Sequence, residues 1–452
     1  MDDPVEAEVS QPALLPDGTI GALVVPALEA APEAALIGIP DAFGGWFDLT
    51  AGEFLHRARS LASGFMAAGL QAGDVIAVLS TSRFEVALVD LAAALAGAVV
   101  LPLSPLDGPT ELLAVLEETR ARAVVVETVR DFARFDEIHG DLPLVAEAWQ
   151  IGLGDLDKLA ELGAGISAQE LAARAAAVDP AAVAALMADS AGVVVELTHA
   201  DLVSRAVELG LALAGSGAVD GEDAAVLQIL PGTDAFARVT TLLALSTGSR
   251  LGHLADPARL IESLASFRPT LLVARPATYE AVEEATLARA EQTSRGPALK
   301  QALEVAVEHS AALEAGTVPR GLKTRFALAD ALVLRGLRKA VGGRVRVVVS
   351  LADEESLPLR LRHLMRALDV RPLEALGGVR TTGPALVERY DDAFERPVGG
   401  VGAPLAGVEV AVGPDGGIGL RGTGVVPPDG ADWLDTGLVG EVEGGRVFLA
   451  DR

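Results

Sequence analysis

Cysteine is absent from this chain of 452 residues, and lysine is scarce. The absence of cysteine excludes disulfides, thiolate zinc sites and cysteine nucleophiles, and it suits a reducing compartment. Lysine occurs only at positions 158, 300, 323 and 339, so nearly every basic side chain is an arginine. Aromatic residues make up only 4% of the chain. The hydrophobic core must therefore be built on Ala, Val and Leu.

Positive charge is also in short supply, since 36 Lys and Arg oppose 63 Asp and Glu, giving a formal net charge of -27. Nucleic acids and anionic membranes both need clustered Lys and Arg, so we expect neither as the main partner. The acidic N-terminus lacks the apolar segment of a secretory signal. The most apolar stretch, 86–103, is interrupted by Asp90 and predicts a buried helix followed by a buried strand. We expect a cytoplasmic protein that is not integral to a membrane.

Apolar strands alternate with amphipathic helices along most of the chain. Strands are predicted at 75–79, 98–101, 123–126, 225–230, 270–273 and 345–349, and a strong helix over 322–337. Continuous apolar strands between helices are typical of a parallel sheet that is covered on both faces, which predicts an α/β fold. After Pro384 the strands are short and broken by Gly and Pro, which predicts antiparallel β-structure with Trp433 in its core.

These patterns predict four regions. They are a loosely structured lead-in over 1–45, a first α/β subdomain over 46–180, a second α/β subdomain over 181–384 and a small β-barrel subdomain over 385–452.

The common cofactor and catalytic signatures are missing or out of context. Gly417, Gly419 and Gly422 satisfy G-x-G-x-x-G, but they lie between two short strands and not between a strand and a helix, so we interpret them as a chance match. No G-x-x-x-x-G-K-[ST] and no G-x-S-x-G occurs. No two of the six histidines have the i, i+4 spacing of a helical metal site, and we predict no metal site.

Several collinear stretches carry more information together than any one does alone. They include LTHADL at 197–202, FRPTLLVARPATYEAV at 267–282, RFALADALVLRGLRKAVGGRVRVVVS at 325–350, VGGVGAPLAGVEV at 398–410 and DWLDTG at 432–437. With the α/β unit at 47–103, they resemble the adenylate-forming superfamily, specifically its long-chain acyl-CoA synthetases. The resemblance implies the fold of the large N-terminal domain of those enzymes: two α/β subdomains with largely parallel sheets plus a small barrel. It also implies ATP and Mg²⁺ as cofactors, and an acyl pocket near Pro276 and Tyr279.

The segment that resembles the family's phosphate loop departs from the pattern. The family's loop is rich in Ser, Thr and Gly and ends in Pro-Lys-Gly, so that backbone N–H groups and hydroxyls surround the phosphates. The stretch LMADSAGVVVELTH, at 186–199, keeps only Ser190 and one glycine. It carries Asp189, whose carboxylate would repel a phosphate, and no lysine lies between Lys158 and Lys300.

Two further motifs of the family also differ here. In the first, an aromatic residue stacks on adenine and a Glu ligates Mg²⁺. Leu376 and Arg380 stand at those positions, shortly after Glu374. In the second, an Asp after Thr-Gly binds the ribose hydroxyls. Leu438 stands there, and the chain stops at Arg452, where the family's hinge begins, so the resemblance implies that the C-terminal catalytic domain is absent.

The resemblance assigns a vestigial nucleotide site to seven positions. The family's nucleotide contacts are lost at three others, Leu376, Arg380 and Leu438. The seven are Ser190, Thr198, His199, Glu374, Asp435, Thr436 and Arg452. The residues themselves also suit a packing role: Thr198 is a good N-cap for a helix that begins near Ala200.

Taken together, the motifs predict a catalytically degenerate long-chain acyl-CoA synthetase-like protein. It would be a pseudoenzyme that serves as a scaffold or partner subunit in fatty-acid and lipid metabolism, beside an active acyl-CoA synthetase or another lipid-metabolism protein. No bound cofactor is predicted. Two alternatives stay open: a module that binds an acyl ligand near Tyr279, and ATP-dependent fatty-acid activation with the missing domain supplied in trans. A new anion site at Arg380 is also open.

Overall fold

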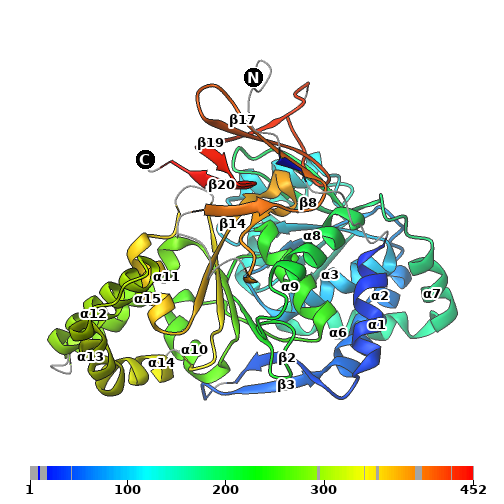
Figure 1. Ribbon diagram of the computed structural model, residues 1–452. Helices are drawn as coiled ribbons and strands as arrows, with labels where there is room; N and C mark the ends of the chain where they lie inside the picture. Colours follow the sequence, from blue (N-terminus) through cyan, green and yellow to red (C-terminus); the bar gives the residue numbers. More distant parts are fainter. Residues whose placement is uncertain are drawn as a thin grey trace.

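The computed structural model describes residues 9–10, 18–41, 43–292, 296–340, 342–352, 356–391, 400–428 and 430–450. Its described strands form one sheet of six strands and one of fourteen. Helices pack on these sheets and between them (Figure 1). The predicted α/β fold is confirmed.

The first sheet is parallel except at one edge, where the last pair is antiparallel. In sheet order its strands are β7 (Glu147–Gln150), β6 (Ala123–Val126), β4 (Val75–Leu79), β5 (Val99–Leu103), β8 (Val183–Ala188) and β9 (Val194–Thr198). Strand β4 is buried throughout, with Ile76 and Val78 in one core and Ala77 and Leu79 in another. Because side chains alternate between the faces of a strand, this pattern shows that both faces of the sheet are covered.

Helices connect the strands of this first unit. They are α2 (Ala51–Ala67), α3 (Phe84–Ala96), α4 (Pro109–Glu118), α5 (Val129–His139), α6 (Asp155–Leu162) and α7 (Ala168–Ala176). Thr50 and Glu53 form a capping box at the start of α2. The stretch 86–103 is a buried helix followed by a buried strand, as predicted. Among the described residues, no helix combines the length and the apolar character needed to cross a membrane.

The second sheet has a parallel centre flanked by antiparallel strands. From one edge, its first strands are β3 (Trp46–Thr50), β2 (Ala35–Pro40), β11 (Arg250–His253), β10 (Ala225–Gln228), β12 (Leu271–Ala274), β13 (Val347–Leu351) and β14 (Arg371–Gly378). The sheet continues through β15 (Gly383–Val387), β16 (Gly400–Pro404), β20 (Arg446–Leu449), β19 (Leu434–Glu443), β18 (Gly417–Gly422), β17 (Val408–Val412) and β1 (Val9–Ser10).

The C-terminal strands are antiparallel, as predicted, but they extend the second sheet because β16 pairs with β15. No recorded pairing among the described strands closes them into a ring, so the predicted small barrel is not confirmed. Trp433 is half-buried and does not fill a core. The Arg421 guanidinium lies 4.3 Å from the centroid of its ring, a cation–π contact that suits a partly exposed indole.

Residues 18–41 are more ordered than predicted. Helix α1 (Ile20–Ala30) is capped by Thr19 and buries Ile20, Val24 and Leu28, which are four residues apart. Strand β2 then pairs in parallel with β11 inside the second sheet. The loosely structured lead-in is therefore corrected for residues 20–40, since the many Ala and Pro residues concealed a regular apolar stripe.

The two sheets also do not follow the predicted boundaries at 45 and 180. Strands β8 and β9 belong to the first sheet, although they follow residue 180, while β2 and β3 belong to the second. A hydrophobic pattern identifies a strand but not the neighbouring strand with which it pairs. The predicted subdomain boundaries therefore differ from the division between the two sheets.

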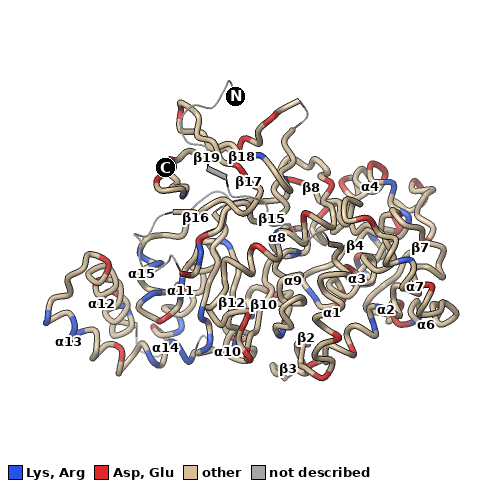
Figure 2. The backbone as a smooth tube through the Cα atoms, turned by 45° about the vertical axis from the view of Figure 1, so that its right-hand side comes forward, with Lys and Arg blue, Asp and Glu red and all other residues tan. Residues whose placement is uncertain are grey.

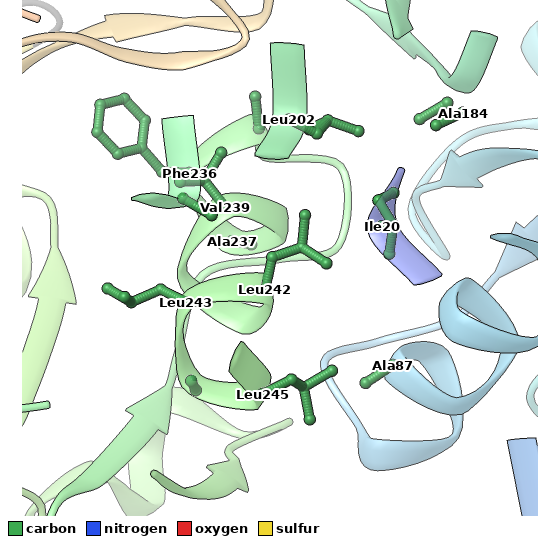
Figure 3. Close-up of a cluster of buried hydrophobic side chains, with 14 of the residues drawn as sticks. Ile20, Ala87, Ala184, Leu202, Phe236, Ala237, Val239, Leu242, Leu243 and Leu245 are labelled. Carbon is green, nitrogen blue, oxygen red and sulfur yellow. The ribbon is translucent and has the colours of Figure 1, made fainter. Parts of the chain in front are cut away.

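Helices α1 and α9 (Ala235–Thr247) join the two units into one core. Figure 3 shows Leu242 and Leu245 of α9 reaching toward Ile20 and toward Ala87 of α3. A largely buried ion pair crosses the same junction, where Arg238 Nη1 of α9 lies 3.1 Å from Asp90 Oδ2 of α3. Asp90, which interrupts the apolar stretch in the sequence, is thus held by a partner from the second unit.

A set of helices projects from one end of the second unit (Figure 1). They are α11 (Pro276–Gln292), α12 (Gly296–Glu314), α13 (Arg320–Ala329), the π-helical segment η4 (Asp330–Leu334) and α14 (Arg335–Ala340). The predicted helix over 322–337 is confirmed. Its π-helical turn rotates Leu334 into the core, where the side chain is fully buried.

Candidate functional site

The predicted site residues lie on elements from both sheets. The turn between β8 and β9 approaches the 3₁₀ turn η5 (Val379–Thr381), which follows β14. Helix α8 (His199–Ala212) leads away from β9, and the segment between β18 and β19 lies next to η5. In Figure 2 the labels of β8, α8 and β15 lie close together near this junction.

Asp189 organises the turn between β8 and β9. Its Oδ1 accepts hydrogen bonds from the backbone N–H groups of Ala191 and Val193, each at 2.9 Å. Ser190 is exposed beside it. Burial opposes ionisation of the Asp189 carboxyl, but the Val193 amide and the Arg380 guanidinium outweigh it and lower its pKa. The turn therefore presents a carboxylate whose hydrogen-bonding capacity is already in use.

Arg380 is the partner of that carboxylate. Its Nε donates to Asp189 Oδ2 at 2.7 Å, and its Nη1 donates to the Val426 carbonyl at 3.2 Å. The Val426 N–H in turn donates to the Arg380 carbonyl at 2.7 Å. The two side chains are only 20% and 11% exposed for Arg380 and Asp189. The guanidinium thus joins the first sheet to the C-terminal strands, and the Asp189 carboxylate is its counter-ion. An external anion at Arg380 would have to compete with that carboxylate.

Arg205 is a second buried cation at the same junction, and sequence reasoning missed it. This fully buried side chain of α8 donates from Nε to the Thr381 carbonyl at 3.0 Å and from Nη2 to the Thr423 carbonyl at 2.5 Å. Burial lowers its pKa to about 10, although Asp201 and Glu208 oppose the shift. A charged residue in the apolar stripe of α8 was the only signal for it in the sequence.

Thr198 and His199 have structural contacts. Thr198 caps α8: its Oγ1 accepts from the Asp201 N–H at 3.1 Å and donates to Asp201 Oδ2 at 2.6 Å. His199 is 1% exposed, and its Nδ1 accepts from the Ile20 N–H at 3.4 Å. Burial lowers the pKa of His199 to about 4, so the ring is neutral near pH 7 and links α8 to the start of α1.

Glu374 belongs to a buried charge network between the second sheet and the C-terminal strands. Arg362 Nη2 lies 2.6 Å from Glu374 Oε2 and 3.6 Å from Glu388 Oε2. The Leu357 N–H donates to Glu374 Oε1, and Arg446 Nη2 lies 3.4 Å from Glu388. Burial raises the pKa of Glu374 to about 7 against the pull of Arg362. Glu374 is therefore surrounded by charged side chains that connect parts of the fold. The sequence did not identify Arg362, Glu388 or Arg446 as members of this network.

The third predicted segment lies on β19. Asp435 is exposed, and its Oδ1 accepts from the Gly437 N–H at 2.9 Å. Thr436 Oγ1 donates to the Ile418 carbonyl at 2.8 Å and accepts from the Leu438 N–H at 3.2 Å. Leu438 is buried at 6% exposure. Arg452 lies outside the described residues.

The proposed acyl-pocket residues lie in the second hydrophobic core. Tyr279 is 5% exposed, and its hydroxyl is within 3.2 Å of the Leu272 carbonyl and 2.9 Å of the Val349 carbonyl. Pro276, at the start of α11, is also buried. Leu376 of β14 is 3% exposed and is paired with Leu386 of β15. These three side chains pack the fold.

Two cavities lie away from these residues. One, of about 990 Å³, lies between α1, α2, α3 and α7 and is lined mostly by Ala, Gly, Val and Leu. The other, of about 320 Å³, is lined by polar groups that include Arg83, Glu127 and His253. Neither is lined by Asp189, Arg380 or Tyr279. No group of three or more His, Asp or Glu within the described ranges could hold a metal ion.

Comparison with known proteins places this architecture in a family. Residues 27–425 match the model of the AMP-binding enzyme family. The chain is 30% identical over 390 residues to the long-chain-fatty-acid–CoA ligase FadD15 of Mycobacterium tuberculosis. That alignment covers 85% of this chain and 64% of the relative, so the chain spans less than two thirds of the relative's length. A 4-coumarate–CoA ligase-like protein of Oryza sativa subsp. japonica is 31% identical over 244 residues, 49% of this chain and 42% of that protein.

Solved structures agree with the fold. A long-chain-fatty-acid–CoA ligase (FadD1) from Archaeoglobus fulgidus is similar with a TM-score of 0.70 at 16% identity, covering 100% of this chain and 87% of that one. The N-terminal domain of FACL13 from Mycobacterium tuberculosis is similar with a TM-score of 0.65 at 17% identity, covering 96% and 100%. The long family match and the 30% identical relative agree with the two-sheet architecture, and the chain belongs to the AMP-binding enzyme family.

Proposed function

We propose that this chain keeps the acyl-CoA ligase-like fold of the AMP-binding family without adenylating an acyl substrate, and that it acts as a scaffold or partner subunit in fatty-acid metabolism. The observation that carries the proposal is the ion pair between Asp189 and Arg380. The resemblance assigns one position to phosphate binding and the other to Mg²⁺ binding. Here the two side chains bind each other.

The residues at this junction do not fit a Mg²⁺–nucleotide complex. Phosphates need N–H donors and cations, whereas the turn amides of Ala191 and Val193 already donate to the Asp189 carboxylate. Mg²⁺ needs oxygen ligands, and Arg380 supplies only N–H donors. Inserting a triphosphate would break the pair and leave the Asp189 carboxylate facing phosphate charge. The junction is therefore unsuited to ATP-dependent chemistry.

The other assigned positions support the same conclusion. Leu376 and Leu438 are buried aliphatic side chains, which can neither stack on adenine as Tyr does nor accept hydrogen bonds from ribose. Glu374 is held by Arg362, and Thr198 is engaged as a helix cap. A role in fatty-acid metabolism rests on the fatty-acid–CoA ligases among the relatives.

The test is calorimetry with Mg²⁺–ATP, an acyl-adenylate analogue and a long-chain acyl-CoA in parallel, together with an assay for acyl-AMP formation. We expect no acyl-AMP and no binding of Mg²⁺–ATP at physiological concentration. Formation of acyl-AMP by the chain alone would refute the proposal. Formation only after a partner is added would establish activation in trans, and binding of acyl-CoA alone would favour an acyl-ligand module.

A further inference from the structure

The distribution of charge along the chain is strongly uneven. Residues 320–346 contain eight Lys and Arg and a single acidic residue, Asp330, in a protein whose formal net charge is -27. Two of the four lysines, Lys323 and Lys339, lie in this segment. Such a concentration produces a local positive field that the whole-chain charge conceals. Six of the eight cations lie in α13, η4 and α14, over 320–340 at the projecting end of the molecule (Figure 2). The other two, Arg344 and Arg346, bond to Asp223 and to the Gly217 carbonyl.

One side of this helical segment is anchored to the fold. Leu322 and Leu334 are buried, and the Phe326 ring stacks on His309 of α12 with ring centroids 3.9 Å apart. Arg338 donates to Asp330 Oδ1 at 2.6 Å and to the Ala367 and Leu368 carbonyls at the C-terminal end of α15 (Leu359–Ala367). These contacts fix which side of the helix faces outward.

The outward side combines leucines with cations. Leu328 and Leu332, one helical turn apart, are 61% and 73% exposed. The Arg335 side chain is 70% exposed, and Lys339 follows one turn later, also exposed. Isolated exposed leucines are common, but two that lie one helical turn apart and are followed by an exposed Arg and Lys form an amphipathic stripe.

Several of these cations are not neutralised by a carboxylate of the described residues. Arg320, Lys323 and Lys339 are exposed and form no ion pair with another described residue. Within the part of the chain that the structure describes, Arg335 pairs only with Asp330, at 3.2 Å, and Asp330 keeps Arg338 as its closer partner. An approaching anionic surface would therefore not have to break a buried interaction.

We propose that α13, η4 and α14 form a docking face for an anionic lipid surface. A helix that lies in the plane of a membrane interface inserts its apolar side chains among the headgroups while its Lys and Arg contact lipid phosphates. The two exposed leucines, Leu328 and Leu332, followed by Arg335 and Lys339 at helical spacing, match that arrangement. An acidic protein surface would use the cations but gives no comparable place to two separate exposed leucines.

Vesicle binding tests the proposal directly. The purified full chain is centrifuged with vesicles of phosphatidylcholine alone and with vesicles of equal parts phosphatidylcholine and phosphatidylglycerol. We expect binding to the anionic vesicles only, weakened by added salt because screening shortens the reach of the charges. Equal binding to both vesicles, or binding to neither, would overturn the proposal.

Two pairs of substitutions locate the face. Arg335→Gln with Lys339→Gln removes two charges and is expected to weaken vesicle binding by roughly tenfold or more, since each cation near an anionic surface contributes about fivefold. Leu328→Gln with Leu332→Gln, which keeps helix propensity, is expected to weaken binding without altering the salt dependence. Unchanged binding in either pair would contradict the docking face.

Helix α6 offers a matched control. Lys158 and Leu162 are also four residues apart and exposed, at 68% for the Lys side chain and 57% for the leucine, but they lie among acidic residues. Lys158→Gln with Leu162→Gln should leave vesicle binding unchanged. If the substitutions at 328, 332, 335 and 339 change the oligomeric state in size-exclusion chromatography while no vesicle binding is seen, the face is a protein interface, and the lipid proposal fails.

Discussion

Individual charged residues in this chain acquire their roles from partners that are distant in the sequence. Asp189 and Arg380 each look like an isolated defect in a nucleotide site, yet they are separated by 191 residues and form one ion pair. Glu374 shows the same effect, because its setting is created by Arg362 and Glu388. At this scale the sequence predicts which side chains are unusual, but the contacts explain what each one does.

The titration of Glu374 yields a prediction about stability. Its folded-state pKa of about 7 lies above the ordinary value of 4.5, so the folded protein binds this proton more tightly than the unfolded chain. The resulting stabilisation is complete below pH 4.5 and is lost as the pH rises through 7. Glu374→Gln cannot titrate and should remove a pH dependence on the order of a few kcal/mol.

The measurement is the free energy of unfolding by urea at several pH values from about 4.5 to about 8. Glu117→Gln, on the exposed side of α4, is the control and should keep the wild-type slope. An identical slope in wild type and Glu374→Gln would show that the buried network titrates elsewhere.

At the scale of secondary-structure elements, local signals were reliable. The apolar strand over 75–79, the buried helix and strand within 86–103 and the helix over 322–337 were predicted from short segments and are confirmed. These features depend on residues within a few positions of one another, so the sequence contains all their determinants. The concentration of Lys and Arg over 320–340 is also a local feature of the sequence, although the net charge of the whole chain concealed it.

Helix α8 provides a test of whether Thr198 has a structural role. Thr198→Ala removes the N-cap acceptor and is expected to lower the free energy of unfolding by about 1 kcal/mol, while Thr198→Ser should largely restore it. Both are measured by urea denaturation. If Thr198→Ala left stability unchanged but altered the binding of a nucleotide, the threonine would belong to a ligand site.

At the scale of the whole molecule, the two sheets depend on a shared junction. Helix α9 of the second unit packs against α1 and α3, and the largely buried pair of Asp90 and Arg238 crosses the same interface. Burial raises the pKa of Asp90 in spite of Arg238, so the pair is held in a desolvated setting. Removing one partner leaves the other buried without its counter-charge.

Asp90→Ala is therefore expected to cost about 3–5 kcal/mol, whereas the double substitution Asp90→Leu with Arg238→Met should be far less destabilising than either single change. Thermal unfolding and urea denaturation measure both. The exposed pair of Lys158 and Asp155 is the comparison, and Lys158→Ala should cost less than about 1 kcal/mol. Equal costs at the two pairs would mean that the junction does not rely on this ion pair.

The sequence by itself determined the α/β class, most helices and strands, the family resemblance and the substitutions at Asp189, Leu376, Arg380 and Leu438. Each of these depends on residue type and on short-range periodicity. Only the tertiary structure decided that residues 20–40 are part of the core, that β8 and β9 join the first sheet, that the Tyr279 hydroxyl is bound to backbone carbonyls, and that Trp433 is half-buried against Arg421. It alone placed Arg380 against Asp189 and Arg205 beneath η5. Strand partners and charge pairs are chosen across hundreds of residues by packing of the whole chain, and no local pattern encodes that choice.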